Sequence, residues 1–242
     1  MERLNRLSID SSDAVTDLCI LGAKYPTDKS PYSILPFDTT RHPYTAIYDL
    51  LFAQKRYSPL VIGESGIYYN MSTHLWKAYF PHATFYGWDL NPKAIENANG
   101  HHLERCQYGI MNMGDANSIF SVLSACNTEF DILIDDSSHL FEHQVLFAQI
   151  AYRFLKPGGV LIVEDVKGEN THSMYEAELK SVFPYFSLGM FIDAKHCSTS
   201  STDDRVIALF RNQEPAPLIS APAVNEPPLV AEAIARINSK AR

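Results

Sequence analysis

Two short apolar segments of the chain, residues 132–134 and 160–163, each run directly into a pair of acidic residues, and a histidine follows the first pair. The residues concerned are Asp135, Asp136, His139, Glu164 and Asp165. If the two segments are neighbouring strands of a parallel sheet, four carboxylates and one imidazole meet at a single edge of that sheet. Carboxylates so close together repel one another unless a cation or a cationic ligand lies among them. The pattern therefore indicates a binding or catalytic site.

The elements that would position these residues follow from the order of apolar patterns. Strand-like runs alternate with helical ones between about residues 41 and 211, which predicts a parallel sheet covered by helices on both faces. Strands are expected at residues 59–63, 84–89, 105–110, 131–135 and 160–163. Helices are expected at 72–79, from Asn91-Pro92 onward, at 116–125 and at 139–155, the last being ended by Lys156-Pro157-Gly158-Gly159. Residues 185–192 and 205–210 are expected to form a terminal antiparallel pair, so the fold class is α/β and Rossmann-like with seven strands.

Two appendages flank this predicted domain of residues 41–212. Residues 1–40 are polar and irregular in pattern and are expected to form a lid. Residues 213–228 hold five prolines and are expected to be an extended linker. Residues 229–242 carry an apolar stripe at helical spacing, which indicates a helix that docks on its own domain or contacts a second copy in a homo-oligomer.

Composition limits the function classes. The chain has 242 residues, 46% of them hydrophobic and 20% charged, as is typical of a globular protein. A formal net charge of −8 argues against a dedicated nucleic-acid binder. The N-terminus lacks the apolar core of a signal peptide, no apolar run reaches the length of a membrane helix, and the four cysteines are scattered without a CxxC pair. We expect a cytoplasmic protein with reduced thiols and no membrane contact, although the cysteine pattern leaves a disulfide open.

The turns after the first three strands predict the type of cofactor. The first strand runs into Gly63-Glu64-Ser65-Gly66, the second ends in Asp89, and Gly114-Asp115 follows the third. An acid at the end of the second strand can accept hydrogen bonds from a ribose, and Asp115 can accept one from an adenine amino group. The full GxGxxG turn that binds a pyrophosphate is absent. A glycine-poor turn with an added acid suits S-adenosylmethionine, which carries an adenosine and positive charge but no phosphate.

Residues 25–211 resemble class I S-adenosylmethionine-dependent methyltransferases, and in particular the macrocin and mycinamicin sugar O-methyltransferases and the related cephalosporin-hydroxylase-like group. The matching pieces are Thr27-Asp28-Lys29, Tyr44, Tyr48, Glu64-x-Gly66, Ser72, Trp76, Tyr79-Phe80-Pro81, Tyr86-Gly87-x-Asp89, Gly114-Asp115, Ile134-Asp135-Asp136-x-Ser138-His139, Leu155-Lys156-Pro157-Gly158-Gly159 and Glu164-Asp165. The Leu-Lys-Pro-Gly-Gly turn is common to many methyltransferases, whereas the two acidic pairs are typical of the metal-dependent members. One departure is Asn70, where the family usually has a second glycine.

The resemblance implies roles for individual residues. Those implied to bind S-adenosylmethionine are Glu64, Gly66, Ser72, Asp89 and Asp115, with Asp135 on the cofactor side. Asp136 and Asp165, together with Glu164, are implied to bind magnesium, and His139 is implied to be the general base. The Thr27–Lys29 segment is implied to fold over the cofactor site. The implied activity is magnesium-assisted methyl transfer to a hydroxyl of a small natural product.

The chemistry agrees with these residue types. A sugar hydroxyl is a poor nucleophile near neutral pH, and a divalent cation that binds two neighbouring hydroxyls lowers their pKa. Carboxylate oxygens select magnesium or calcium over zinc. A histidine near the acids could take the proton, because its ordinary pKa is close to operating pH.

Three other interpretations stay open. Asp135 and Asp136 could simply cap the following helix. His139-Leu140-Phe141-Glu142-His143 satisfies the H-x-x-E-H pattern of inverted zinc peptidases, which would make the protein a zinc hydrolase. The fold could also belong to a catalytically silent partner protein.

Overall fold

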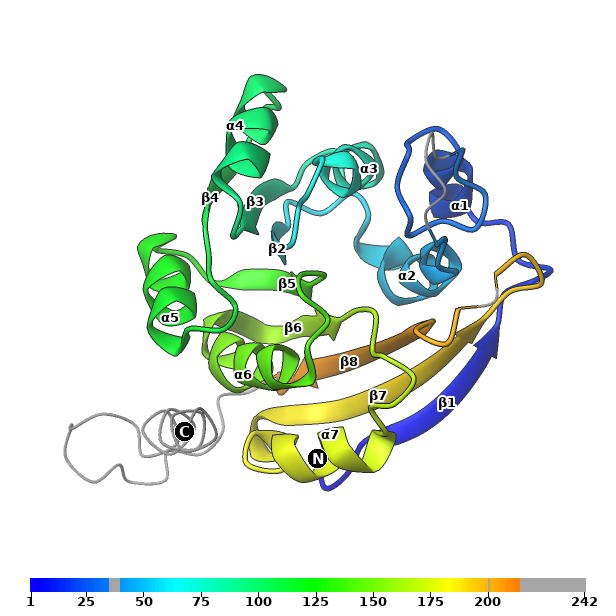
Figure 1. Cartoon of the computed structure of the whole chain (residues 1–242), viewed down its shortest axis with the longest axis vertical. Coiled ribbons are helices and arrows are strands. Elements are labelled where there is room, and N and C mark those ends of the chain that lie inside the picture. Colours follow the sequence, from blue (N-terminus) through cyan, green and yellow to red (C-terminus); the bar gives the residue numbers. More distant parts are fainter. Residues whose placement is uncertain (35–39, 200, 214–242) are drawn as a thin grey trace.

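The alternating pattern folds into one eight-stranded sheet in the computed structural model, which describes residues 1–34, 40–199 and 201–213. Figure 1 shows the twisted sheet with helices on both faces. The strand order is β1-β7-β8-β6-β5-β2-β3-β4. The strands are β1 (Asn5–Asp10), β2 (Val61–Ser65), β3 (Thr84–Asp89), β4 (Cys106–Ile110), β5 (Phe130–Asp135), β6 (Leu155–Val163), β7 (Phe186–Lys195) and β8 (Arg205–Arg211). Of these described strands only β8 runs antiparallel to its neighbours, which are β6 and β7.

The helices divide between the two faces. Buried side chains of α1, α2 and α3 form one apolar cluster with one face of the sheet, and those of α5, α6 and α7 form another cluster with the opposite face. The helices are α1 (Asp17–Gly22), α2 (Tyr44–Phe52), α3 (Met71–Tyr79), α4 (Pro92–Gly100), α5 (Ala116–Ala125), α6 (Phe141–Ala151) and α7 (His172–Leu179), with short 3₁₀ turns at Ala53–Lys55, Tyr152–Phe154 and Phe183–Tyr185. Apolar residues that alternate along each strand therefore face two separate cores, as both-sided coverage of a parallel sheet requires.

The predicted α/β class and the antiparallel element near the chain end are confirmed. The sheet has eight strands rather than seven, because β1 pairs in parallel with β7 at the edge. This strand lies in the segment that the sequence pattern presents as irregular. Its residues alternate only weakly in hydrophobicity since most of its side chains are exposed, and the pairing with β7 is what makes it a strand.

The helix expected at 139–155 is shorter than predicted. It begins at Phe141, because His139 adopts a left-handed backbone with φ of 55° and Leu140 is extended, and α6 ends at Ala151. The Lys-Pro-Gly-Gly segment expected as a turn lies inside β6, where the register with β5 shifts between Phe130 and Ile132. Leu155 pairs with Phe130 and Val160 pairs with Ile132, so residues 156–159 form an irregularity within β6 and regular pairing with β5 resumes at Val160, where the sequence predicts the strand to begin.

The site-bearing edge follows from the strand order. From β2 the chain builds β3 and β4 on one side, and β5 and β6 lie on the other, so the strand order reverses at β2 and β5. Ligands of open parallel sheets bind at the carboxyl ends of the strands at such a point. The predicted linker after Gln213 and the predicted C-terminal helix lie outside the described residues. Within the described ranges, no helix has both the length and the apolar character needed to cross a membrane.

Candidate functional site

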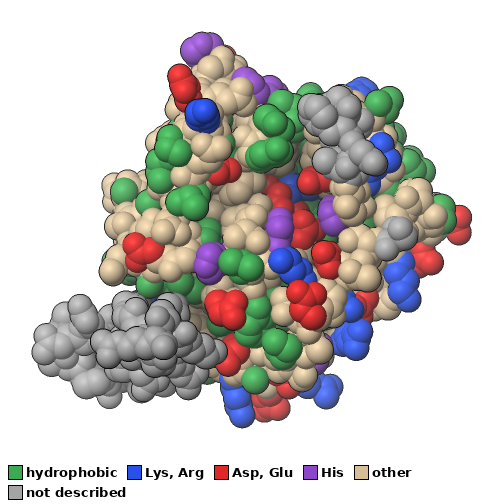
Figure 2. Space-filling view, in the orientation of Figure 1, with side chains coloured by type: hydrophobic (Ala, Val, Ile, Leu, Met, Phe, Trp, Pro, Cys, Tyr) green, Lys and Arg blue, Asp and Glu red, His purple; other side chains and the backbone are tan. Residues whose placement is uncertain are grey.

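The two acidic pairs meet at the carboxyl edge of the sheet, as the sequence predicts, because β5 and β6 are neighbours. Backbone hydrogen bonds continue just past the strand ends: the amide of Asp136 donates to Ser65 O at 2.9 Å, and that of Glu164 donates to Asp135 O at 2.9 Å. Figure 2 shows acidic and histidine side chains gathered near the middle of this face, around the loops after β5 and β6. The carboxyl edge of the sheet is therefore polar, whereas β5 and β6, which lead to it, are apolar.

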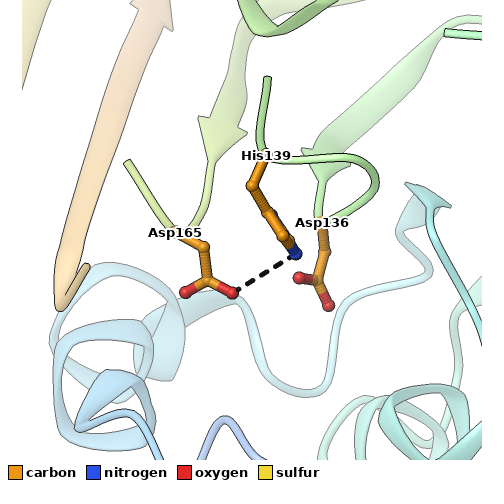
Figure 3. A group of neighbouring side chains, drawn as sticks. All are labelled: Asp136, His139 and Asp165. Atoms are coloured by element: carbon orange, nitrogen blue, oxygen red, sulfur yellow. Dashed lines mark ion pairs between the residues drawn. The ribbon is translucent and has the colours of Figure 1, made fainter. Parts of the chain in front are cut away.

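Three of the predicted residues converge on one point. One ligand atom each from Asp136, His139 and Asp165 can be chosen so that all lie within 4.8 Å of one another. Figure 3 shows the imidazole of His139 pointing between the two carboxylates, and its Nε2 lies 3.7 Å from Oδ2 of Asp165. Both His139 and Asp165 have positive φ angles, of 55° and 50°, which turn their side chains out of the regular course of the chain. Burial lowers the pKa of His139, with Asp165 partly opposing, so the imidazole is neutral at pH 7.

Asp165 is supported by Tyr44, the first residue of α2, and by His42, which precedes that helix. The hydroxyl of Tyr44 donates to Asp165 Oδ1 at 2.6 Å, and His42 Nδ1 lies 3.4 Å from the same oxygen. His42 also contacts Oδ1 of Asp204 at 2.8 Å. Burial alone would lower the pKa of His42, but the bond to Asp204 and the charge of Asp165 outweigh it and raise that pKa. These partners fix the direction of the Asp165 carboxylate.

Lys29 supplies a cation inside the acid cluster, which the sequence-based interpretation did not identify. Its Nζ lies 2.5 Å from Asp136 Oδ2 and 2.6 Å from Glu164 Oε2. Desolvation would lower the pKa of this buried amine, but Asp136, Glu164 and Glu64 raise it well above its usual value, so it stays charged. The signal in the sequence was the excess of acids itself, since so many carboxylates require a counter-ion.

Glu164 faces Lys29 rather than the group of three. Its second oxygen, Oε1, accepts from the hydroxyl of Tyr48 at 2.5 Å. Burial raises the pKa of Glu164 to about 7, although Lys29 partly opposes the shift. Tyr44 and Tyr48 are four residues apart on α2 and so project from the same face of the helix, one toward each member of the Glu164-Asp165 pair. The four-residue spacing of Tyr44 and Tyr48 is the feature of the sequence that indicates their shared orientation.

Glu64 and Ser72, both predicted to hold the cofactor, lie buried beneath the edge. Oε2 of Glu64 accepts from Ser72 Oγ at 2.7 Å, and its Oε1 lies 3.3 Å from Lys29 Nζ and 3.4 Å from Trp76 Nε1. Both carboxylate oxygens therefore have protein partners. In the described structure Glu64 joins α3 to the Thr27–Lys29 segment.

The loop after β2 keeps the shape that its glycine requires. Gly66 has a φ of 93°, and a Cβ there would lie 1.9 Å from the carbonyl oxygen of Asp136. Asn70 occupies the left-handed region with φ of 66°, a conformation that asparagine tolerates better than most residues. Its Nδ2 lies 3.1 Å from the hydroxyl of Tyr108. Asn70 thus adopts the backbone that a glycine at this position would take.

Asp89 and Asp115 lie where the sequence predicts: Asp89 is the last residue of β3, and Asp115 follows β4 and precedes α5. Asp89 accepts backbone hydrogen bonds from Tyr68 at 3.0 Å and from Asn91 at 2.8 Å, one at each carboxylate oxygen. Asp115 is exposed and caps α5 by accepting from Asn117 N at 2.9 Å. A carboxylate oxygen has two lone pairs, so both side chains keep the capacity to accept from a ligand.

Asp135 is fully buried. Its Oδ1 accepts from Ser137, at 2.6 Å from the hydroxyl, whereas its Oδ2 has no hydrogen-bond partner. Burial raises the pKa of Asp135 to about 6. Ser65 pairs in register with Asp135, and its Oγ is also buried and without a partner, as is Nδ1 of His139. Such groups are rare in folded proteins and fit a site that a bound ligand completes.

The zinc-peptidase pattern is not assembled. His139 precedes α6 and His143 lies within it, so the two do not share one helical face. His143 Nδ1 contacts Ser138 Oγ at 2.8 Å, and the group of potential metal ligands among the described residues does not include it. The two carboxylates of the assembled group, Asp136 and Asp165, are oxygen ligands of the kind that hard divalent cations prefer.

Comparison with known proteins identifies the family. Residues 63–211 match the family model described as a methyltransferase domain, and the chain belongs to this family. It is 34% identical over 137 residues to 8-demethyl-8-(2-methoxy-alpha-L-rhamnosyl)-tetracenomycin-C 3'-O-methyltransferase of Streptomyces olivaceus, a match that covers 52% of this chain and 32% of that protein. It is 26% identical over 159 residues to mycinamicin VI 2''-O-methyltransferase of Micromonospora griseorubida, covering 62% and 36% respectively. The matches thus span about a third of the length of these relatives, and they confirm the resemblance to sugar O-methyltransferases drawn from the sequence.

A solved structure shares the fold. The MycE methyltransferase from the mycinamycin biosynthetic pathway, in complex with Mg and SAH, superposes with a TM-score of 0.60. The superposition covers 86% of this chain and 58% of that chain, at 19% sequence identity. The arrangement of strands and helices described above is therefore that of a methyltransferase fold.

Proposed function

We propose that this chain carries out S-adenosylmethionine-dependent O-methylation of a hydroxyl on a sugar or other vicinal diol of a small natural product, assisted by magnesium or another hard divalent cation. The convergence of Asp136, His139 and Asp165 at the carboxyl edge carries this proposal. Support comes from the methyltransferase family, from relatives named as O-methyltransferases of glycosylated natural products, and from a fold neighbour described with Mg and SAH.

The residues of this edge have different proposed roles in cofactor binding. Gly66, Asp89 and Asp115 line the loops where the cofactor would lie, with Asp89 accepting from the ribose and Asp115 from the adenine. Glu64 and Ser72 act from beneath by holding α3 in place, and Asp135 offers its unpartnered Oδ2 from below the edge. When bound, S-adenosylmethionine supplies an electrophilic methyl group and a divalent cation lowers the pKa of a hydroxyl that it contacts.

His139 is the proposed general base. Its imidazole is neutral at pH 7 because burial lowers its pKa, so it can accept the proton of an acceptor hydroxyl at Nε2. Asp165 is close enough, at 3.7 Å from Nε2, to stabilise the imidazolium that results. The carboxylates of Asp136 and Asp165 lie on either side of this ring (Figure 3), and these two side chains would hold the cation.

The test uses radiolabelled methyl transfer. The full chain is incubated with methyl-labelled S-adenosylmethionine, a panel of rhamnosylated polyketides with free vicinal hydroxyls, and their aglycones, with magnesium or with EDTA. We expect transfer to the glycosides only, and a loss with EDTA. His139→Gln should lower the rate about 100-fold or more while S-adenosylhomocysteine still binds, and His143→Gln is the matched control with little effect. Absence of cofactor binding in calorimetry would instead indicate a silent methyltransferase-fold protein.

A further inference from the structure

The loop after β2 has a left-handed backbone at every second residue. Gly66, Tyr68 and Asn70 have φ angles of 93°, 44° and 66°, and only the first of the three is a glycine. Asparagine tolerates this conformation, whereas a bulky residue such as tyrosine does so only with strain, because its Cβ is crowded by the backbone. Tyr68 is therefore the strained residue of this loop.

The side chain of Tyr68 gains little burial from this conformation. Tyr68 is 67% exposed and Tyr69 is 51% exposed. Their rings contact each other, with centroids 4.0 Å apart and an interplanar angle of 55°. Two rings that are both largely exposed remove little apolar area from water, so their packing does not explain a tyrosine at this position. Strained residues that packing does not explain are found at sites where a protein binds a ligand.

The backbone of Tyr68 is attached to the position where the cofactor is proposed to bind. Its amide donates to Oδ2 of Asp89 at 3.0 Å, and Asp89 is the residue proposed to accept from the ribose. Leu90, which follows Asp89, is also exposed, at 62%. An aromatic and an aliphatic side chain next to the proposed ribose acceptor are thus open to solvent.

This combination of groups matches the chemistry of an adenosine. A ribose offers hydroxyl donors to a carboxylate, and a purine offers flat faces that stack on aromatic rings. The amino-acid part of S-adenosylmethionine is charged at both its amine and its carboxylate, and it would gain much less from an exposed aromatic ring. Of the two halves of the cofactor, the adenosine is therefore the one that a tyrosine beside Asp89 suits.

We propose that Tyr68, packed against Tyr69, is a further cofactor-binding residue, and that its ring stacks on the adenosine of S-adenosylmethionine. The left-handed backbone of Tyr68 presents this ring at the carboxyl edge of the sheet, which is why the strain is retained. The inference rests on the proposed cofactor-dependent function, since it names a further contact of the same site.

Substitutions at Tyr68 separate the ring from the backbone. Tyr68→Asn and Tyr68→Gly remove the ring and suit a left-handed backbone, so both variants should melt at the wild-type temperature or above it. Both should nevertheless bind S-adenosylhomocysteine on the order of tenfold more weakly, as is usual when a stacking ring is lost. Tyr68→Phe keeps the ring and should bind within about threefold of the wild type. Tyr57→Asn is the matched control, because Tyr57 is 68% exposed and precedes β2, at the opposite end of that strand.

The experiment measures binding to the full chain by calorimetry, with thermal unfolding of the same samples without ligand. The two probes are S-adenosylhomocysteine and methylthioadenosine, which keeps the adenosine and lacks the amino-acid part. The wild type should bind both, and Tyr68→Asn should weaken both by the same factor. A loss confined to S-adenosylhomocysteine would mean that the ring contacts the amino-acid part, and the assignment to adenosine would be wrong. Failure of the wild type to bind methylthioadenosine would also count against a stacked adenosine.

Three other outcomes would overturn the proposal. The first is wild-type affinity for S-adenosylhomocysteine in Tyr68→Asn and Tyr68→Gly. The second is a melting temperature well below that of the wild type in both variants, which would make Tyr68 a structural residue. The third is a loss of affinity in Tyr68→Phe or Tyr57→Asn as large as that in Tyr68→Asn.

Methyl transfer to the glycoside panel is recorded in parallel to separate the two proposals. Methyl transfer by the wild type, with unchanged cofactor affinity in the Tyr68 variants, would overturn this inference and leave the proposed function standing. The expected binding pattern without transfer to any glycoside would support the role of Tyr68 and count against the proposed O-methylation.

Discussion

The hydroxyl of Tyr44 donates to Oδ1 of Asp165 at 2.6 Å, although 121 positions separate the two residues in the chain. Tyr44 is the first residue of α2, and Asp165 follows the end of β6, so the contact joins the N-terminal third of the protein to the central edge of the sheet. A tyrosine that is fully buried and bonded to a carboxylate holds that carboxylate in one direction. Asp165 is thus positioned before any ligand binds.

Removing this hydroxyl should weaken metal binding without removing a ligand. We expect Tyr44→Phe to lower Mn²⁺ affinity about tenfold, as is usual when an outer partner of a metal ligand is lost. The protein should also lose about 1–3 kcal/mol of stability, because a buried charged acceptor loses its donor. Calorimetry with Mn²⁺ and urea unfolding measure the two effects. Tyr79→Phe is the matched control, since that hydroxyl bonds Asp49 at 2.8 Å away from the acidic edge; equal Mn²⁺ losses in both variants would refute a specific role for Tyr44.

The rate of methyl transfer should remain high below the ordinary pKa of histidine. Burial lowers the pKa of His139, so its neutral, proton-accepting form persists as the pH falls, and the acid limb of kcat/KM should lie below pH 6.5. A pH–rate profile of the wild type and of His139→Gln tests this. The residual activity of His139→Gln should no longer fall along this acid limb. If the acid limb is unchanged in the variant, a group other than His139 causes it.

Stability should fall as the pH rises from about 4 to about 6, in part because of Asp135. Its pKa is raised from 3.8 to about 6 in the folded protein by burial, so between these values the folded state binds more protons than the unfolded state. The sign is therefore a loss of stability with rising pH, up to about 3 kcal/mol for a shift of this size. Asp135→Asn should reduce that loss, measured by urea unfolding at pH 4 and pH 7. Glu104→Gln, at a side chain 89% exposed, should leave it unchanged; identical curves for Asp135→Asn and wild type would contradict the assignment.

Gly66 should tolerate no side chain. An added Cβ would lie 1.9 Å from Asp136 O at a φ of 93°, so Gly66→Ala must displace the loop after β5. We expect a loss of more than about 3 kcal/mol, or failure to fold, together with loss of cofactor and Mn²⁺ binding. Gly100→Ala is the control, because nothing lies within 4 Å of a Cβ there, and alanine should add about 0.5–1 kcal/mol at this helical position. A wild-type melting temperature for Gly66→Ala would show that the loop adapts freely.

The sequence by itself determined the parts that depend on local pattern. Apolar runs and their spacing predict β2 to β8 and most of the helices between them, because burial on both faces of a parallel sheet demands those periods. The acids that end β5 and β6 were recognisable as one edge cluster for the same reason. Asn91 before Pro92 predicted the start of α4, since capping is decided within a few residues.

The tertiary structure alone decided which acid has which partner. Glu164 and Asp165 are adjacent and chemically alike, and no local pattern shows that one faces Lys29 and the other faces His139. Those directions follow from side chains more than one hundred residues away and from the left-handed backbone of Asp165. The same reason explains β1, which is a strand because β7 lies beside it. Local preferences determine most of the helices and strands of this protein, whereas long-range contacts determine which partner each acid of the site faces.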